Sequence, residues 1–298
     1  MLEETLASIE ECRRSTGRCH VKVIVSDNSV DRSDPNAIVG KYPEIAYVWR
    51  GGLLDVFEHL KCVFEETVAD YVMALHDDDL VLPGLFDAAV AMLESDSVIA
   101  AVGFNALLMF GTHVSDRSFL EGLRQPIRLD SSSKLLERYA SWHRGEGFAP
   151  FPIYCYRVAY LRLIPAPSSD RGGIHADVTL LMDLSSKFQI VMAPDVFMHY
   201  RRHATNMSAR IKTSHRISWR RFMMENYPDE YLRFERILTA KYLIAYVREN
   251  SVRLGCSQYR RRRAAVLKRI MHLLWPDTLL SKRFWLKLTL DYFLPRLR

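Results

Sequence analysis

Three adjacent carboxylates follow a short apolar run in the first third of the chain. The run 71–75 has the composition of a buried strand, and His76 leads from it directly into Asp77, Asp78 and Asp79. Neighbouring like charges repel, so such a cluster costs free energy unless a cation lies among them. Mg²⁺ and Mn²⁺ bind carboxylate oxygens and commonly join them to the phosphates of a substrate. The segment therefore predicts a divalent-cation site, and a solvated acidic turn is the plainer alternative.

Further polar segments follow other apolar runs in a definite order. They are Ser26 to Asp31 after the run 21–26, Asp177 at the start of a helical pattern, and Tyr200 to Asn206 after the run 190–194. Open α/β sheets bind ligands at the carboxyl ends of their strands, which is where the first of these segments and the acidic residues fall.

The remaining pattern supplies the elements that must position these side chains. Strands are expected over 21–26, 45–49, 71–75, 98–104, 153–157 and 190–194, and helices over 2–13, 35–41, 54–68, 84–95, 135–142 and from Asp177 onward. Strands that alternate with helices predict an α/β fold with a mostly parallel sheet flanked by helices. The polar stretch 111–128 is expected to be a loop.

The ordered set of segments resembles the family-2 glycosyltransferases of GT-A fold. The matching positions are Ser26 to Asp31, His76 to Pro83, Asp177 and Tyr200 to Asn206. Each motif is weak alone, and their order along roughly the first 210 residues carries the resemblance. It implies a Rossmann-like GT-A catalytic domain over 1–210, followed by a basic α-helical region over 211–298.

The resemblance also implies a role for each matched side chain. A bound Mg²⁺ or Mn²⁺ would be held by Asp78, Asp79 and His203. A nucleotide-diphosphate sugar would contact Asp27 at the nucleobase, Asp77 at the ribose, Arg201 at the phosphates, and Arg50 nearby. His76 departs from the Asp often found at its position, and no role is assigned to it.

Asp177 matches the base that deprotonates the acceptor hydroxyl in an inverting transfer. Each role has a plainer alternative. Asp177 could cap its helix, Asp27 could bond the backbone of its own turn, and His203 could be a surface residue. The preferred interpretation is a metal-dependent inverting glycosyltransferase that acts on a glycan or lipid-linked acceptor in surface polysaccharide synthesis.

Family members usually begin with a strand whose end contacts the nucleotide base. This chain opens instead with a helical pattern, in which Leu2, Leu6 and Ile9 are the apolar positions. A sheet that lacks an interior strand would leave backbone groups unpaired. We therefore expect the natural protein to start before Met1, and sequencing its amino terminus would test this. The acidic start does not have the pattern of a signal peptide.

Charge divides the chain into two contrasting parts. Residues 1–200 hold 18 Lys and Arg against 28 Asp and Glu, a net charge of −10, whereas residues 201–298 hold 23 against 7, a net charge of +16. The segment 282–294 mixes basic and bulky apolar residues, as an interfacial helix does. This favours a cytoplasmic protein that associates peripherally with the anionic inner face of the plasma membrane. A helix packed on the catalytic domain is the alternative.

The sequence leaves two other functional classes open. The chain could be a degenerate, non-catalytic homologue that acts as a binding or scaffold subunit, although the presence of both Asp78 and Asp177 argues against this. It could also bind nucleic acid through its basic end, but the acidic part contains no recognisable nucleic-acid module. The five cysteines have no CxxC spacing, so neither a structural zinc site nor a disulfide framework is expected.

Overall fold

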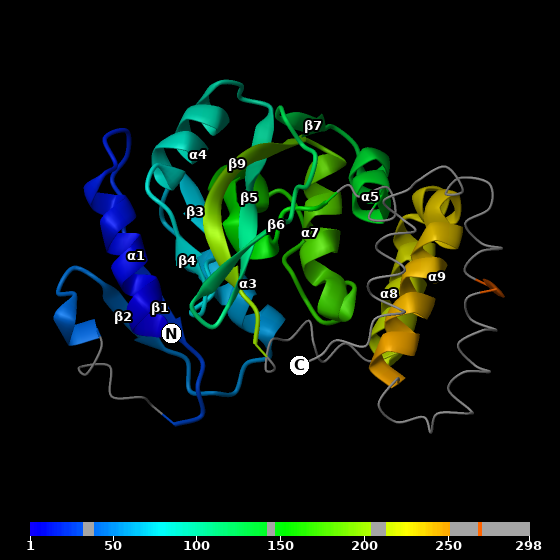
Figure 1. Cartoon of the computed structure of the whole chain (residues 1–298), viewed down its shortest axis with the longest axis horizontal. Helices are drawn as coiled ribbons and strands as arrows, with labels where there is room; N and C mark the ends of the chain where they lie inside the picture. Colours follow the sequence, from blue (N-terminus) through cyan, green and yellow to red (C-terminus); the bar gives the residue numbers. More distant parts are fainter. Residues whose placement is uncertain (32–38, 142–146, 204–212, 251–267, 270–298) are drawn as a thin grey trace. The chain divides into compact units, whose positions relative to one another are not determined.

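The computed structural model describes residues 1–31, 39–141, 147–203, 213–250 and 268–269 (Figure 1). The chain forms two compact units. The first comprises residues 1–135 and 149–210, and the second comprises residues 136–148 and 211–298. Every described side chain that the sequence marks for chemistry lies in the first unit.

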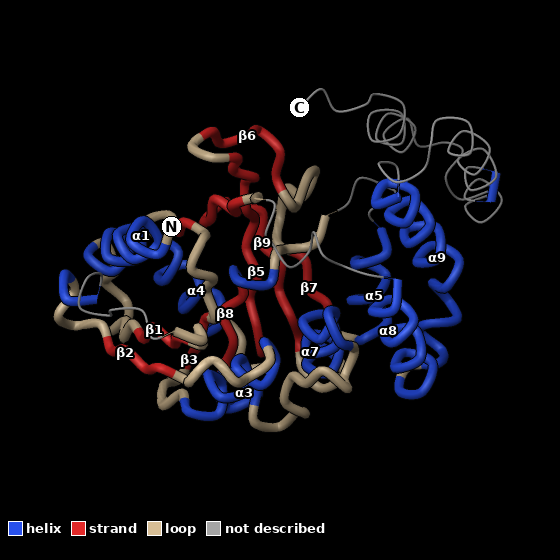
Figure 2. The backbone as a smooth tube through the Cα atoms, turned by 90° about the horizontal axis from the view of Figure 1, so that it is seen from below, coloured by secondary structure: helices blue, strands red, loops and turns tan. Residues whose placement is uncertain are grey.

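The first unit is built on two β-sheets (Figure 2). The larger sheet has the strand order β3-β8-β5-β9-β4, with β6 beside β5 and β7 beside β9. Its strands are β3 Tyr71–Met73, β4 Leu80–Val81, β5 Ile99–Phe110, β6 His113–Ser118, β7 Ile127–Leu129, β8 Tyr154–Arg157 and β9 Gln189–Arg201. The smaller sheet pairs β1 (Ile24–Asp27) with β2 (Ala46–Trp49) in parallel. A strand is present at each of the six expected positions.

The expectation of a mostly parallel sheet is wrong, because the main sheet is mixed. Only its β5–β9 pair is parallel, whereas β3–β8, β5–β8, β4–β9, β5–β6 and β7–β9 are antiparallel. A parallel pair needs a long crossover, usually a helix, between its strands. Between β5 and β6 there is only a two-residue turn, whose first residue, Gly111, has a φ of +60°. That geometry suits a hairpin and reverses the chain inside the stretch expected to be a loop.

Five helices complete the first unit on its described residues. They are α1 (Leu2–Arg14), α3 (Val56–Glu66), α4 (Leu85–Glu94), α6 (Val158–Leu161) and α7 (Ala176–Ser185), with short 3-10 turns at Val39–Lys41, Phe151–Ile153 and Gly173–His175. Helix α1 packs against β4 and α4, α4 against β5, and α7 against β9. The expected helix over 35–41 lies partly outside the described residues.

Local sequence explains where two of these helices begin and how one of them packs. Asp55 caps α3, because its carboxylate accepts from the backbone of Glu58 while the Glu58 side chain accepts from the backbone of Asp55. Helix α1 carries Glu3 and Glu4 in its first turn and basic residues in its last turn, which complements the helix dipole. Its buried face places Thr5 beside the apolar positions that fix its packing.

The second unit contains α8 (Thr213–Asn226) and α9 (Pro228–Asn250), which pack together. Trp219 is fully buried there between Tyr139 and Tyr231. Helix α5 (Ser132–Ala140) runs across the boundary of the two units. The expected interfacial segment 282–294 lies outside the described residues. Among the described helices, none combines the length and the hydropathy that crossing a bilayer requires.

Candidate active site

The three carboxylates lie in a turn between β3 and β4, called here the acidic turn (residues 76–79). Helix α1 holds this turn through a single hydroxyl. The Oγ1 of Thr5 donates to the carbonyl oxygens of Asp77 and Asp79, at 3.0 and 2.8 Å. One helical turn later, Ser8 Oγ accepts the backbone N–H of Val81 at 3.1 Å. The backbone of the turn is therefore fixed by an element about 70 residues away in sequence.

The end of β9 supplies the other side of the site. Its pairing with β4 sets Leu80 opposite His199, so the residues that follow His199 pass beside the acidic turn. The backbone N–H of Arg201 donates to Asp79 Oδ1 at 2.8 Å. His203 Nε2 lies 2.6 Å from Asp78 Oδ2. The acidic turn and the late segment, which the family resemblance assigned to one metal site, thus meet in one place.

Burial gives these carboxylates an unusual electrostatic environment. Asp78 and Asp79 are 8% and 1% exposed, whereas Asp77 faces solvent. Burial raises the pKa of Asp79 to about 7; the Arg201 backbone hydrogen bond opposes this, and the charge of Asp78 adds to it. Asp79 Oδ2 is buried and has no hydrogen-bond partner among the described residues. A buried oxygen without a donor is costly, and a divalent cation would satisfy it, so the residues present fit such an ion.

Asp27 and Arg50 form a second group at the carboxyl end of β1. Asp27 Oδ2 accepts the hydroxyl of Tyr47 at 2.6 Å, and its Oδ1 accepts both the N–H and the hydroxyl of Ser29. Burial alone would raise the pKa of Asp27, but these hydrogen bonds outweigh it and the pKa is lowered. Arg50 is held in place by Glu66, through two contacts of 2.6 Å, and it also donates to Ser26 Oγ at 3.1 Å.

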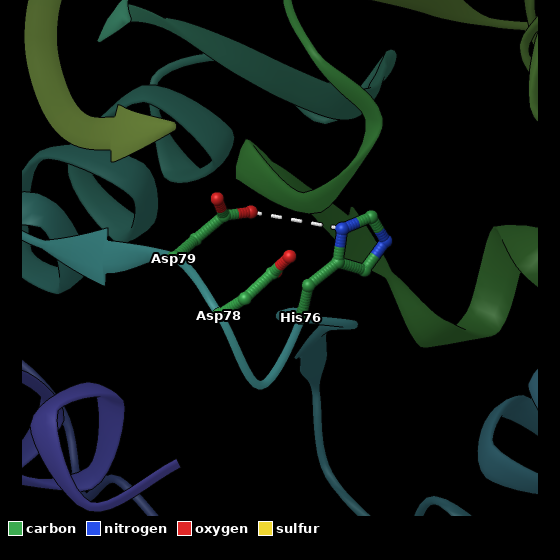
Figure 3. Close-up of side chains that lie close together, drawn as sticks. All are labelled: His76, Asp78 and Asp79. Atoms are coloured by element: carbon green, nitrogen blue, oxygen red, sulfur yellow. Dashed lines mark ion pairs between the residues drawn. The ribbon is translucent and has the colours of Figure 1, made fainter. Parts of the chain in front are cut away.

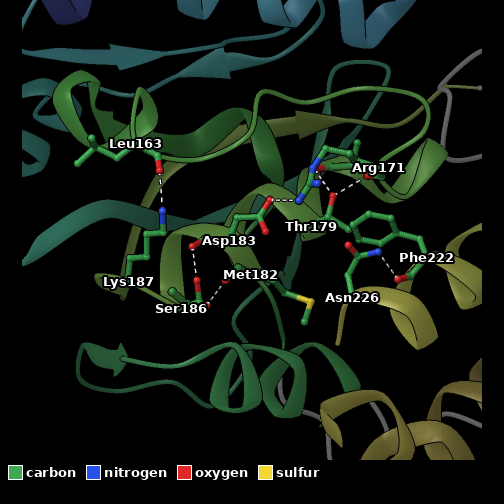
Figure 4. Close-up of polar contacts among 11 residues, drawn as sticks. Leu163, Arg171, Thr179, Met182, Asp183, Ser186, Lys187, Phe222 and Asn226 are labelled. Atoms are coloured by element: carbon green, nitrogen blue, oxygen red, sulfur yellow. Dashed lines mark hydrogen bonds and ion pairs between the residues drawn. The ribbon is translucent and has the colours of Figure 1, made fainter. Parts of the chain in front are cut away.

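Asp177 lies in the first turn of α7, where its Oδ1 accepts the N–H of Val178 at 2.8 Å. Figure 4 shows how the preceding loop is tied to this helix. The guanidinium of Arg171 pairs with Asp183 at 2.8 Å, and Thr179 Oγ1 donates to the Arg171 carbonyl at 2.8 Å. These contacts fix the start of α7, and they leave Asp177 half-buried rather than enclosed.

Tyr200 connects Asp177 to the acidic turn electrostatically. Burial raises the pKa of its hydroxyl and the charges of Asp79, Asp78 and Asp177 raise it further, whereas the charge of Arg202 opposes them. One phenol is therefore within electrostatic range of both the acidic turn and the helix that carries Asp177. Its ring is held edge-on against Phe119, with the centroids 5.1 Å apart.

The structure thus arranges the expected residues in three neighbourhoods. Asp77, Asp78, Asp79, Arg201 and His203 gather around the acidic turn, Asp27 and Arg50 sit by β1 and β2, and Asp177 opens α7. The guanidinium of Arg201 points to Glu4 on α1, at 2.9 Å, while its backbone faces the turn. Asn206, at the end of the matched segment, lies outside the described residues.

The sequence interpretation missed three residues with a part in this geometry. Thr5 and Ser8 hold the acidic turn, and the only signal for Thr5 was its place on the buried face of the first helical pattern. Tyr200 belonged to a matched segment but received no role. Each acts through a tertiary contact, which helical or strand periodicity does not encode.

Comparison with known proteins is informative at the level of structure only. No protein-family model and no curated protein sequence matches this chain. A crystal structure of S. aureus TarS, residues 1–349, in complex with UDP-GlcNAc is similar with a TM-score of 0.57, at 12% identity over 93% of this chain and 78% of that one. A second S. aureus TarS structure is similar with a TM-score of 0.52, at 13% identity over 93% of this chain and 47% of that one. The chain therefore has the GT-A fold that the ordered motifs predict.

Proposed function

We propose that this chain is a metal-dependent inverting glycosyltransferase that uses a nucleotide-diphosphate sugar as donor. The observation that carries the proposal is the meeting of two distant motifs, in which His203 Nε2 lies 2.6 Å from Asp78 Oδ2 across 125 positions of sequence. A carboxylate and imidazole cluster at the end of a strand is where a GT-A fold would bind a cation and a diphosphate. The likeness to a structure solved with UDP-GlcNAc supports a nucleotide sugar as the donor class.

The roles proposed are those that the family resemblance implies, and the grouping of the residues into three neighbourhoods supports them. Asp78, Asp79 and His203 would hold Mg²⁺ or Mn²⁺, which when bound would neutralise charge that develops on the leaving diphosphate. Asp77, exposed on the same turn, would contact the ribose. Arg201 would contact a phosphate if its guanidinium left Glu4.

The nucleobase would bind near Asp27, with Arg50 beside it. Asp27 is already held by Tyr47 and Ser29, so its carboxylate is rigid and ionised at neutral pH. A fixed, charged acceptor suits the ring N–H of a base, because little ordering is needed on binding.

Asp177 would act as the general base. Its carboxylate takes the proton of the acceptor hydroxyl as that oxygen bonds to the anomeric carbon, and the bond from that carbon to the phosphate oxygen breaks with inversion. Asp177 and the acidic turn both act on the pKa of the Tyr200 hydroxyl, and the proposal places the acceptor between them. The acceptor class proposed is a glycan or lipid-linked glycan in surface polysaccharide synthesis.

The proposal also includes a cytoplasmic, peripheral membrane location. It is supported by the net charge of +16 over residues 201–298, which would draw that region to anionic lipid. Binding to vesicles with and without phosphatidylserine, at rising salt, would test it. Equal binding to neutral vesicles, or preference for duplex DNA, would contradict it.

The experiment for the activity is turnover of a panel of UDP-, GDP- and dTDP-sugars, with and without Mn²⁺. Asp78→Asn should abolish metal-dependent turnover and weaken donor binding, whereas Asp177→Asn should abolish transfer while donor binding survives. Asp195→Asn, an exposed carboxylate on β9, is the matched control and should leave both unchanged. Donor binding without turnover of any sugar by the unaltered chain would favour a degenerate, non-catalytic homologue.

A further inference from the structure

His76 is the residue of the acidic turn for which the family resemblance supplied no role. Its Nδ1 lies 3.6 Å from Asp79 Oδ2, and one ligand atom each from His76, Asp78 and Asp79 lies within 4.8 Å of the other two (Figure 3). Opposite ligands of one ion are separated by twice the metal–ligand distance, or about 4–5 Å. The three atoms are therefore spaced as ligands of a single ion could be.

A second observation concerns the oxygen that faces His76. Asp79 Oδ1 accepts the N–H of Arg201, but Oδ2 is buried and finds no hydrogen-bond partner among the described residues. The distance of 3.6 Å from Oδ2 to the His76 ring is too long for a hydrogen bond. The side chain of Asp79 is 2% exposed and that of His76 is 47% exposed. An ion between them would therefore have a carboxylate oxygen on its buried side and an imidazole nitrogen on its solvent side.

A second imidazole, two residues beyond the end of β9, approaches Asp78. His203 Nε2 lies 2.6 Å from Asp78 Oδ2, so the acidic turn has an imidazole at each of its two buried carboxylates. A ring nitrogen that donates a proton to a carboxylate cannot bind a metal at the same time. Metal binding at both partners would therefore replace this hydrogen bond with a bond from each partner to the ion, and the neutral His203 ring would carry its proton on Nδ1.

We propose that His76 is a direct cation ligand, and that its imidazole nitrogen, beside the carboxylates of Asp78 and Asp79, makes the site prefer first-row transition ions to Mg²⁺. The inference rests on the proposed function, in which the bound ion neutralises charge on the leaving diphosphate. Mg²⁺ favours an all-oxygen, near-octahedral shell, whereas imidazole suits Mn²⁺, Co²⁺ and Zn²⁺ increasingly well. With a carboxylate in place of His76, the turn would offer only oxygens, and the preference would shift towards Mg²⁺.

The test is metal binding by the full chain, without donor. Mn²⁺ affinity is read from the electron paramagnetic resonance signal of free Mn²⁺, Mg²⁺ affinity from competition, and nitrogen ligation from the visible absorption of bound Co²⁺. His76→Ala should weaken Mn²⁺ and Co²⁺ binding about tenfold or more and change the Co²⁺ spectrum. His76→Asp should restore Mn²⁺ binding but narrow the ratio of Mn²⁺ to Mg²⁺ affinity.

His113→Ala, an exposed histidine on β6, is the matched control and should bind both ions as the unaltered chain does. The inference is overturned if His76→Ala binds ions like this control while Asp78→Asn does not bind them, because His76 would then only pair with Asp79. If Asp78→Asn also binds ions normally, the metal site of the proposed function fails as well. A third outcome is that ion selectivity depends on His76 but the chain turns over no donor sugar. This outcome would contradict the proposed function and leave the inference about His76 standing.

Discussion

The hydroxyl of Thr5 lies 2.8 Å from the carbonyl oxygen of Asp79, 74 positions later in the chain. The same hydroxyl reaches the carbonyl of Asp77 at 3.0 Å, so one side chain of α1 spans the turn that carries the carboxylates. Thr5 is 3% exposed, which leaves these carbonyls little access to water in its place. The geometry of the acidic turn therefore depends on a helix that carries none of its carboxylates.

Replacing Thr5 with Val tests this dependence, because valine keeps the shape and removes the donor. Loss of the hydroxyl should lower the free energy of unfolding by about 1–3 kcal/mol, since a buried carbonyl is left unpaired. It should also weaken Mn²⁺ binding, because the turn loosens. Denaturant unfolding and Mn²⁺ titration give the two measurements.

Thr67→Val is the matched control, since Thr67 Oγ1 donates only to the Val63 carbonyl within its own helix end. The control should lose stability without losing Mn²⁺ affinity. If both variants bind Mn²⁺ equally, Thr5 supports the fold and not the site.

The pKa of Asp27 is lowered in the folded chain, and Tyr47 is the strongest of the hydrogen-bond partners responsible. A lowered pKa contributes stability that is present above the unfolded value, near 3.9, and is lost as the pH falls through the folded value. Tyr47→Phe should raise the pKa of Asp27. The variant should therefore be less stable than the unaltered chain at neutral pH, and the difference should shrink as the solution becomes strongly acidic.

Carbon-detected NMR titration of the Asp27 carboxyl measures the pKa directly, and unfolding at several pH values measures the stability. Tyr160→Phe is the control, because its hydroxyl donates to the Ser97 carbonyl and touches no carboxylate. A stability difference for Tyr47→Phe that stays constant down to strongly acidic pH would rule out the ionic contribution.

Hydrophobic periodicity predicts buried strands and helices, but it does not predict the tertiary contacts between them. Strands β5 and β9 are apolar runs in the centre of the sheet, and they stand out without any tertiary information. Strand β6 is exposed or half-buried along its length, so it lacks an apolar pattern, and only the turn at Gly111 marks it. Carboxylates attract notice by their type, whereas Thr5 looks like any helical threonine until the backbone that it meets is known.

The two glycines after Arg50 differ in what surrounds them, although both have positive φ. A Cβ at Gly52 would lie 2.5 Å from Val30 Cα and 2.8 Å from the Ser29 carbonyl oxygen, whereas a Cβ at Gly51 meets nothing within 4 Å. Gly51→Ala should cost about 1–2 kcal/mol for the left-handed backbone alone. Gly52→Ala should cost more and should also displace Ser29, which donates to Asp27.

Denaturant unfolding and titration with nucleoside diphosphates separate the two effects. Only Gly52→Ala should lose nucleotide affinity, and Gly51→Ala serves as its control for backbone strain. Equal nucleotide affinity in the two variants would mean that the Asp27 group lies outside the nucleotide site.

Arg201 could either bind the donor diphosphate or only pair with Glu4 in the fold, and variants of both residues distinguish these roles. The guanidinium pairs with Glu4 at 2.9 Å, but Glu4 is 57% exposed, and such a pair contributes at most about 1 kcal/mol. A diphosphate would offer Arg201 a stronger, charge-assisted partner. Arg201→Gln should therefore weaken donor binding more than tenfold while changing stability little. Glu4→Gln should lower stability by at most about 1 kcal/mol and tighten donor binding, because it removes a carboxylate that competes with the phosphates for Arg201.

Isothermal titration with the donor, at two salt concentrations, makes the measurement. Arg128→Gln is the control, because Arg128 also pairs with a carboxylate, that of Asp96 at 2.6 Å, at the other end of β9. It should bind donor as the unaltered chain does. If Arg201→Gln instead destabilises the fold and leaves donor affinity intact, Arg201 serves to link β9 to α1. Another basic residue must then bind the phosphates.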